Sequence, residues 1–223
     1  MKVCAIEPMF PAKILPRSMV MLFAVASGMS VANVYYAQPL LDALGRDFAI
    51  SYAAVGGIVT ATQLGCALAL LLLVPLGDIV ERRTLMLVQL VALVAALGAV
   101  SWASSTWMLL AGMLAVGLLG TAMTQGLIAC AASASDEHER GRVVGAAQGG
   151  VFIGLLLARV FSGVVSDLAG WRAVYGLSAI LMLLLLPLLW QRLPRFGASG
   201  ERTSWLLLIA SMLKLLLTDR VLQ

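Results

Sequence analysis

Residues 76–83 read Leu-Gly-Asp-Ile-Val-Glu-Arg-Arg, and this short charged stretch decides how the chain around it is organised. It separates two long apolar runs, residues 52–76 and 84–102. Each run is long enough to cross the hydrocarbon core of a bilayer, which takes a helix of about 20 residues. Because so few residues join the two runs, we expect two antiparallel helices packed as a hairpin inside a membrane.

The composition of the whole chain agrees with this expectation. Hydrophobic residues make up 61% of the sequence and charged residues 12%, whereas an ordinary soluble domain is about 25% charged. Backbone groups in lipid need hydrogen-bond partners within their own segment, so long apolar runs indicate helices. The sequence therefore predicts an all-α integral membrane protein with six transmembrane helices, at residues 18–41, 52–76, 84–102, 107–132, 143–165 and 173–190.

Basic residues are distributed unequally between the two ends of these spans. Of the 15 Lys and Arg residues, only Arg46 and Arg172 fall on one side, and Arg159 lies inside a span. The others fall on the opposite side, which identifies it as the cytoplasmic side. We therefore expect a multi-pass protein of the bacterial-type inner (plasma) membrane with both termini in the cytoplasm. Basic residues scattered over short loops do not favour binding to nucleic acid.

The hinge between spans five and six repeats a feature of residues 76–83. Asp167 and Arg172 are five residues apart, as are Asp78 and Arg83. The first of these two hinges faces the cytoplasm in the predicted topology and the second faces outward. Spans one to three and four to six would then form two inverted three-helix repeats, which is a common plan of transporters.

Several motifs together resemble the major facilitator superfamily of transporters. Leu76-x-Asp78-x-x-x-Arg82-Arg83 is similar to the family's loop signature between spans two and three, although Val74 and Glu81 replace its glycines. Two further motifs fit the family, Arg140-Gly141-x-x-x-Gly145 and Gly163-x-x-x-Asp167-x-x-Gly170-Trp171-Arg172. Residues 33–41, Asn-Val-Tyr-Tyr-Ala-Gln-Pro-Leu-Leu, resemble a subgroup of small-molecule exporters. The resemblance implies the N-terminal half of a twelve-span transporter that works by alternating access.

The resemblance also implies roles for the hinge residues. Asp78, Arg82 and Arg83 would form a conformational latch between the two halves of such a transporter. The alternative is that the two arginines only enforce topology while Asp78 caps the next helix. A second set would form structural turns, namely Gly141, Gly145, Asp167, Gly170, Trp171 and Arg172.

Polar residues inside the spans are candidates for a substrate cavity. Spans one and four line the path in the family, and the candidates are Asn33, Tyr36, Gln38, Gln125 and Arg159. A charge inside a span is costly, so Arg159 is expected to face a cavity or a partner. The alternative for the uncharged residues is a hydrogen bond between helices. The alternative for Arg159 is a side chain that extends to the outer membrane interface.

Enzymatic chemistry is not indicated by the sequence. The three cysteines have no paired spacing, and the single histidine, His138, lies in a polar stretch between spans. No Asp or Glu lies in the middle of a span, so a buried proton-carrying acid is missing. We expect no enzyme, no metal and no cofactor.

The end of the chain differs from the six spans. We expect residues 1–17 to form a cytoplasmic N-terminus, residues 18–191 the bundle, and residues 192–223 a cytoplasmic linker. Within residues 204–223 the apolar run from Trp205 to Leu217 has thirteen residues, which is too short for a seventh span. This stretch predicts an amphipathic helix on the membrane surface. We interpret the chain as truncated within this linker, and a partner half or a homodimer is the alternative. The expected partners are the lipid bilayer, a small-molecule substrate and such a second half.

Overall fold

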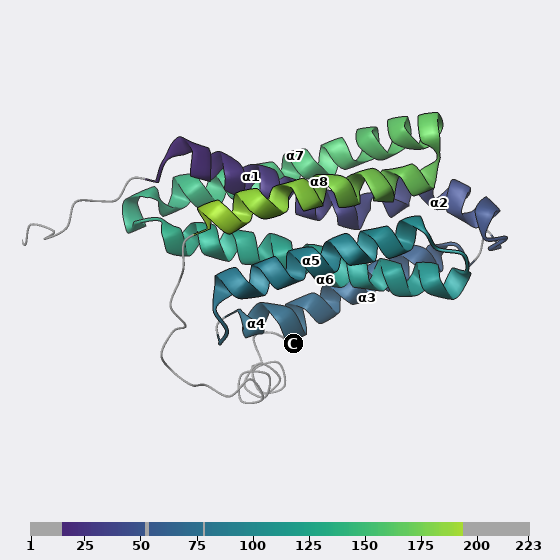
Figure 1. The fold of residues 1–223 in the computed structure, drawn as a ribbon, viewed down its shortest axis with the longest axis horizontal. Helices are drawn as coiled ribbons and strands as arrows, with labels where there is room; N and C mark the ends of the chain where they lie inside the picture. The colour runs from purple at the N-terminus through teal and green to yellow at the C-terminus, as the bar shows by residue number, and fades with distance from the viewer. Residues whose placement is uncertain (1–14, 52–53, 78, 194–223) are drawn as a thin grey trace, which may run out of the picture.

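The protein is a bundle of long helices that lie side by side along its long axis (Figure 1). The computed structural model describes residues 15–51, 54–77 and 79–193. The elements are α1 (Arg17–Tyr35), α2 (Ala37–Asp47), α3 (Gly56–Leu68), the π-helical turn η1 (Ala69–Leu73), α4 (Val74–Leu76), α5 (Arg82–Ser101), α6 (Thr106–Ala134), α7 (Glu137–Ala169) and α8 (Trp171–Arg192). Within the described residues no strand occurs.

Six helical segments are long and apolar enough to cross a membrane, which confirms the predicted all-α fold with six spans. The first segment consists of α1 and α2, and the second consists of α3, η1 and α4. The helices extend beyond the apolar runs from which they were predicted. The first ends at Asp47, and α7 begins at Glu137. Acidic residues near a helix N-terminus interact favourably with its dipole, so the polar start of α7 remains helical.

Two of the spans are interrupted close to a proline. Proline has no backbone N–H, so it cannot bond to the carbonyl four residues earlier. Pro39 therefore leaves the carbonyl of Tyr35 without its helical donor, and the first span divides at Tyr36. In the second span Pro75 lies two residues after the end of the wide turn η1. Both irregularities thus have a local cause in the sequence.

Glycines allow two pairs of helices to touch at the backbone. A Cβ atom at Gly154 of α7 would overlap the carbonyl oxygen of Gly28 of α1. A Cβ at Gly117 of α6 would likewise overlap the carbonyl oxygen of Thr62 of α3. A Cβ at Gly65 of α3 would come equally close to the carbonyl oxygen of Leu114 of α6. Close backbone approach is how helices gain packing energy in lipid, where burying apolar side chains provides little driving force.

The two crossings are related as the inverted repeats require. Gly28 and Gly117, Gly65 and Gly154, and Arg83 and Arg172 are each separated by 89 positions (28 to 117, 65 to 154, 83 to 172). The pairing of α1 with α7 corresponds to that of α6 with α3, and α5 packs on α8. The hinges of residues 76–83 and 166–172 lie at opposite ends of the bundle (Figure 1). Two inverted three-helix repeats therefore make up the fold.

Some predictions concern residues outside the described part of the chain. The amphipathic helix was predicted within residues 204–223, and residues 194–223 are not described. The cytoplasmic N-terminus was predicted at residues 1–17, of which residues 1–14 are not described. The domain boundaries therefore stay predictions.

We predict that Gly154→Ala destabilises the bundle, because its methyl group would collide with the backbone of α1. Overpacking of this kind costs about 1–3 kcal/mol. The matched control is Gly163→Ala on the same helix, where nothing lies within 4 Å of the added Cβ. Thermal unfolding in detergent should show a lower Tm for Gly154→Ala and an unchanged or higher Tm for the control. Equal Tm values for the two variants would contradict the proposed crossing.

Candidate functional site

The two arginines at the end of the first hinge connect it to other helices. Arg82 donates from Nε to the carbonyl of Gly77 at 3.1 Å and from Nη1 to Ser133 Oγ at 2.7 Å. Arg83 donates from Nη2 to the carbonyl of Trp190 in the last turn of α8. Asp78, the third predicted latch residue, lies outside the described residues. The two arginines thus tie the start of α5 to α6 and to α8.

The second hinge has a more extensive network. Gly170 adopts φ = 82°, a left-handed conformation that favours glycine, and this allows a sharp turn between α7 and α8. Arg172 forms an ion pair with Asp47 at the end of α2 and donates from Nη2 to the carbonyl of Ala103 at 3.0 Å. Trp171 donates from Nε1 to Asp47 Oδ2 at 3.1 Å, and its ring lies 4.3 Å from the Arg172 guanidinium.

Arg83 and Arg172 occupy equivalent places in the two repeats. Arg83 lies in the first turn of α5 and donates to a carbonyl at the end of α8. Arg172 lies in the first turn of α8 and donates to the carbonyl of Ala103, just beyond the end of α5. Carbonyls at a helix C-terminus lack intrahelical donors and attract cations. Each arginine therefore caps the C-terminal end of the helix that packs against its own helix.

The candidate cavity residues of the first span are buried in helix packing. Asn33 is 2% exposed, and its Oδ1 accepts a hydrogen bond from Ser178 Oγ of α8. Its Nδ2 donates to the carbonyl of Met29 at 2.8 Å. The ring of Tyr36 is centred 5.4 Å from that of Phe161. Both residues therefore take part in contacts from α1 to α7 and α8.

The other three candidates have exposed side chains. Gln38 lies in the first turn of α2. Gln125 of α6 borders a pocket of about 240 Å³ that also contains Arg82 and Gln89. Arg159 lies on the exposed surface of α7. The structure therefore does not gather the five candidates into a single site.

The predicted turn residues also divide into two groups. Gly170 forms the turn, and Trp171 and Arg172 begin α8. Gly141 and Gly145 lie within α7 and not in a turn, because this helix begins earlier, at Glu137. Asp167 lies near the end of the same helix and is exposed. The expectation of a turn is therefore wrong for Gly141, Gly145 and Asp167.

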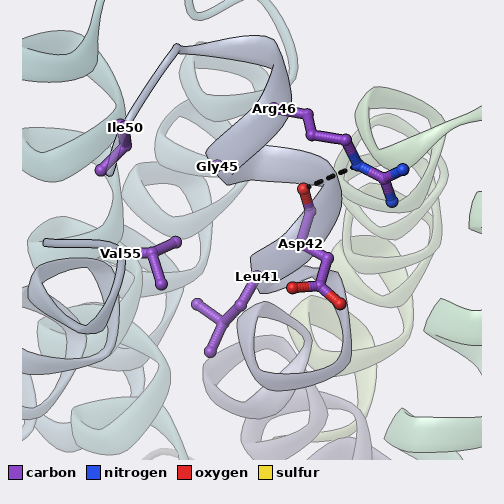
Figure 2. Close-up of a pocket in the computed structure, with 6 residues that line it drawn as sticks. All are labelled: Leu41, Asp42, Gly45, Arg46, Ile50 and Val55. Atoms are coloured by element: carbon purple, nitrogen blue, oxygen red, sulfur yellow. Dashed lines mark hydrogen bonds between the residues drawn. The ribbon is translucent and has the colours of Figure 1, made fainter. Parts of the chain in front are cut away.

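A further pocket of about 430 Å³ lies between α2 and the start of α3 (Figure 2). The charged residues Asp42 and Arg46 line its α2 side, while Ile50 and Val55 line the other. Arg46 is held along its own helix, since its Nε donates to the carbonyl of Asp42 at 3.2 Å. The pocket is wide open and belongs to the same end of the bundle as the Asp47–Arg172 ion pair.

Sequence reasoning missed the partners in these networks. Asp47 lies beyond the apolar run that predicted the first span, and its partner Arg172 is 125 residues away. Ser133 and Ser178 bond to residues 51 and 145 positions away. A single serine or aspartate carries no pattern that identifies so distant a partner. Among the described residues, no group of three or more His, Cys, Asp or Glu could hold a metal ion.

Comparisons with known proteins bear on the whole chain. The sequence profile described as the Major Facilitator Superfamily matches residues 20–222. The chain is 39% identical over 213 residues to "Uncharacterized transporter YgaY" of Escherichia coli O157:H7, covering 92% of the chain and 52% of that protein. It is 36% identical over 167 residues to "Probable transporter SCO4007" of Streptomyces coelicolor, covering 72% of the chain and 37% of that protein.

A solved structure has the same fold. It is a bacterial homolog to the human lysosomal transporter Spinster in an inward-facing and unoccupied conformation, with a TM-score of 0.66 and 16% identity. The match covers 84% of the chain and 45% of that protein. The chain thus spans about half the length of the curated relative YgaY. The relatives YgaY and SCO4007 are both described as transporters. The chain belongs to the Major Facilitator Superfamily.

Proposed function

We propose that this chain is the N-terminal half of a small-molecule transporter that exports its substrate by alternating access. The transporter relatives and the family profile support the class of activity. The inner membrane and cytoplasmic termini are supported by the unequal distribution of Lys and Arg. In family members with both halves, substrate would be held between this half and a second one.

One observation carries the proposal: polar side chains lie exposed on helices that the bundle leaves largely uncovered. The span of α7 is the least buried of the six, followed by the span of α3 to α4. These helices expose Thr60, Gln63, Gln148 and Arg159, and α6 exposes Gln125. Polar and charged groups are costly in contact with hydrocarbon. A second half that covers them and encloses a polar path would remove this cost.

Within this proposal the candidate residues have different roles. Arg82 and Arg83, together with Asp78, form a latch at the cytoplasmic end that changes as the two halves move. Gln38, Gln125 and Arg159 border the substrate path. Asn33 and Tyr36 contribute by orienting α1 against α7 and α8, since their partners lie in those helices.

A second candidate function is a membrane fragment that inserts but does not transport by itself. The observation in its favour is that the chain spans only about half the length of YgaY. The same observation suits a half-transporter that pairs with another copy or with a separate second half. These possibilities differ in whether the chain alone can move a solute.

The first prediction separates them. The chain joined at Gln223 to the C-terminal half of YgaY should export dyes from efflux-deficient cells, whereas the chain alone should not. Loss of ethidium and of carboxyfluorescein from preloaded cells measures this, with equal membrane levels of both forms as the control. Equal export by the chain alone would show that it needs no added half.

The second prediction concerns the latch. Arg83→Ala should slow export about tenfold in the joined form, because it removes the bond from the start of α5 to the end of α8. The control is Arg142→Ala, which removes only an exposed pair with Glu139 on the same helix, a pair of little energetic weight. Unchanged export with Arg83→Ala at normal protein levels would refute the latch.

The third prediction concerns orientation. In a chain whose three cysteines are replaced by alanine, a membrane-impermeant maleimide should label Ser104→Cys in intact cells. His138→Cys should be labelled only after the membrane is made permeable. Both residues are exposed, and they lie at opposite ends of α6. The reverse pattern would place the termini outside the cytoplasm.

A further inference from the structure

The exposed surface of α7 carries a polar stripe. Gln148, Arg159 and Ser166 are separated by 11 and 7 residues. At 3.6 residues per turn these separations leave all three side chains within about 20° of each other around the helix. Gln148 and Arg159 are exposed, and Ser166 is partly exposed. Phe152 lies on the same stripe, seven residues before Arg159, and is 66% exposed.

Between Ile153 and Val164, the other exposed side of α7 is apolar. Ile153, Leu157, Val160 and Val164 are all more than half exposed. Ile153 and Leu157 line a groove of about 560 Å³ between α1 and α7, which also includes Leu181 of α8. This apolar side suits contact with lipid chains. The polar stripe points away from it, so the two sides of one helix are built for different surroundings.

The stripe has a positive charge that no ion pair neutralises among the described residues. Arg159 is the single Lys or Arg inside the six predicted spans, and none of them has an Asp or Glu in its middle. Within the described part of the chain, the Arg159 guanidinium makes no hydrogen bond or ion pair. The nearest acidic residue of α7, Asp167, is eight residues away, about 12 Å along the helix. Within α7, no other charged side chain lies within two helical turns of Arg159, so no charge of its own helix screens its field nearby.

We propose that this stripe lines a water-filled path that admits anions in preference to cations, so that the exported solute carries a carboxylate, phosphate or similar anionic group. This inference rests on the proposed transport function and specifies its substrate class. A guanidinium offers five donors in a geometry that matches carboxylate and phosphate oxygens. Gln148 and Ser166 provide uncharged hydrogen-bonding groups on either side of it. A single fixed charge in a narrow path of low dielectric raises the local concentration of the opposite charge.

The test uses thiol reagents of opposite charge on the joined form, in the background without native cysteines. The reporter is Phe152→Cys, about 10 Å along the helix from Arg159. The matched control is its neighbour Ile153→Cys, which is similarly exposed (59% against 66%) but lies on the apolar side. Modification rates are measured in membranes at low salt with an anionic reagent, sulfonatoethyl methanethiosulfonate, and a cationic one, trimethylammonioethyl methanethiosulfonate. Each rate is divided by that for free cysteine in solution.

We expect Phe152→Cys to react with both reagents, and about fourfold or more faster with the anionic one, since a unit charge 10 Å away gives at least this ratio even at the dielectric constant of water. Adding Arg159→Gln should abolish the preference, and Arg159→Lys should retain it. Ile153→Cys should react much more slowly with both.

Three results would overturn the inference. The first is that Phe152→Cys reacts no faster than Ile153→Cys. The second is that Phe152→Cys reacts at equal normalised rates with the anionic and the cationic reagent. The third is that its preference for the anionic reagent survives Arg159→Gln. Equal rates are also the outcome if a carboxylate of the second half neutralises Arg159. The dye-export assay is independent of these modification rates. If the joined form exports dye but Phe152→Cys shows no preference for the anionic reagent, only the proposed substrate class is refuted. An anion preference without export of any dye leaves the stripe's selectivity standing and counts against the proposed transport.

Discussion

The bundle depends on contact between helix backbones at two crossings. In a bilayer the lipid chains are as apolar as leucine, so apolar side chains do not drive helices together as they do in water. What remains is close packing, and the backbones come very close where Gly150 and Gly154 meet α1 and where Gly117 meets α3. Any side chain at these glycines would push the helices apart. It would also displace the hinges and the polar residues, because the crossings set their positions.

The arginines at the two ends of the bundle complete this arrangement. Because Arg83 and Arg172 are equivalent in the two repeats, each begins one member of the α5–α8 pair and caps the end of the other. Arg172 does more, since it also pairs with Asp47 and lies against the ring of Trp171. The second hinge thus joins the start of α8 to the end of α2 and to the residues that follow α5.

Some polar side chains of the spans are exposed on the surface of the bundle. Gln125 and Arg159 belong to different helices, and neither side chain has a bonding partner among the described residues. Asn33, in contrast, has its amide satisfied within the bundle. The distinction separates a polar group that holds helices together from polar groups that lie exposed on the surface of the bundle.

By itself the sequence determined the six spans, their helical conformation and the inverted repeat, because hydrophobic run length and the spacing of Asp and Arg in the hinges follow directly from residue order. It also singled out Arg159 by its charge. Only the tertiary structure decided that Asn33 and Tyr36 are packed against α7 and α8, and that Asp47 is the partner of Arg172. Those outcomes depend on which helix faces which. That is set by backbone contacts between residues far apart in the chain, 126 positions from Gly28 to Gly154 and 55 positions from Thr62 to Gly117, which no local pattern encodes.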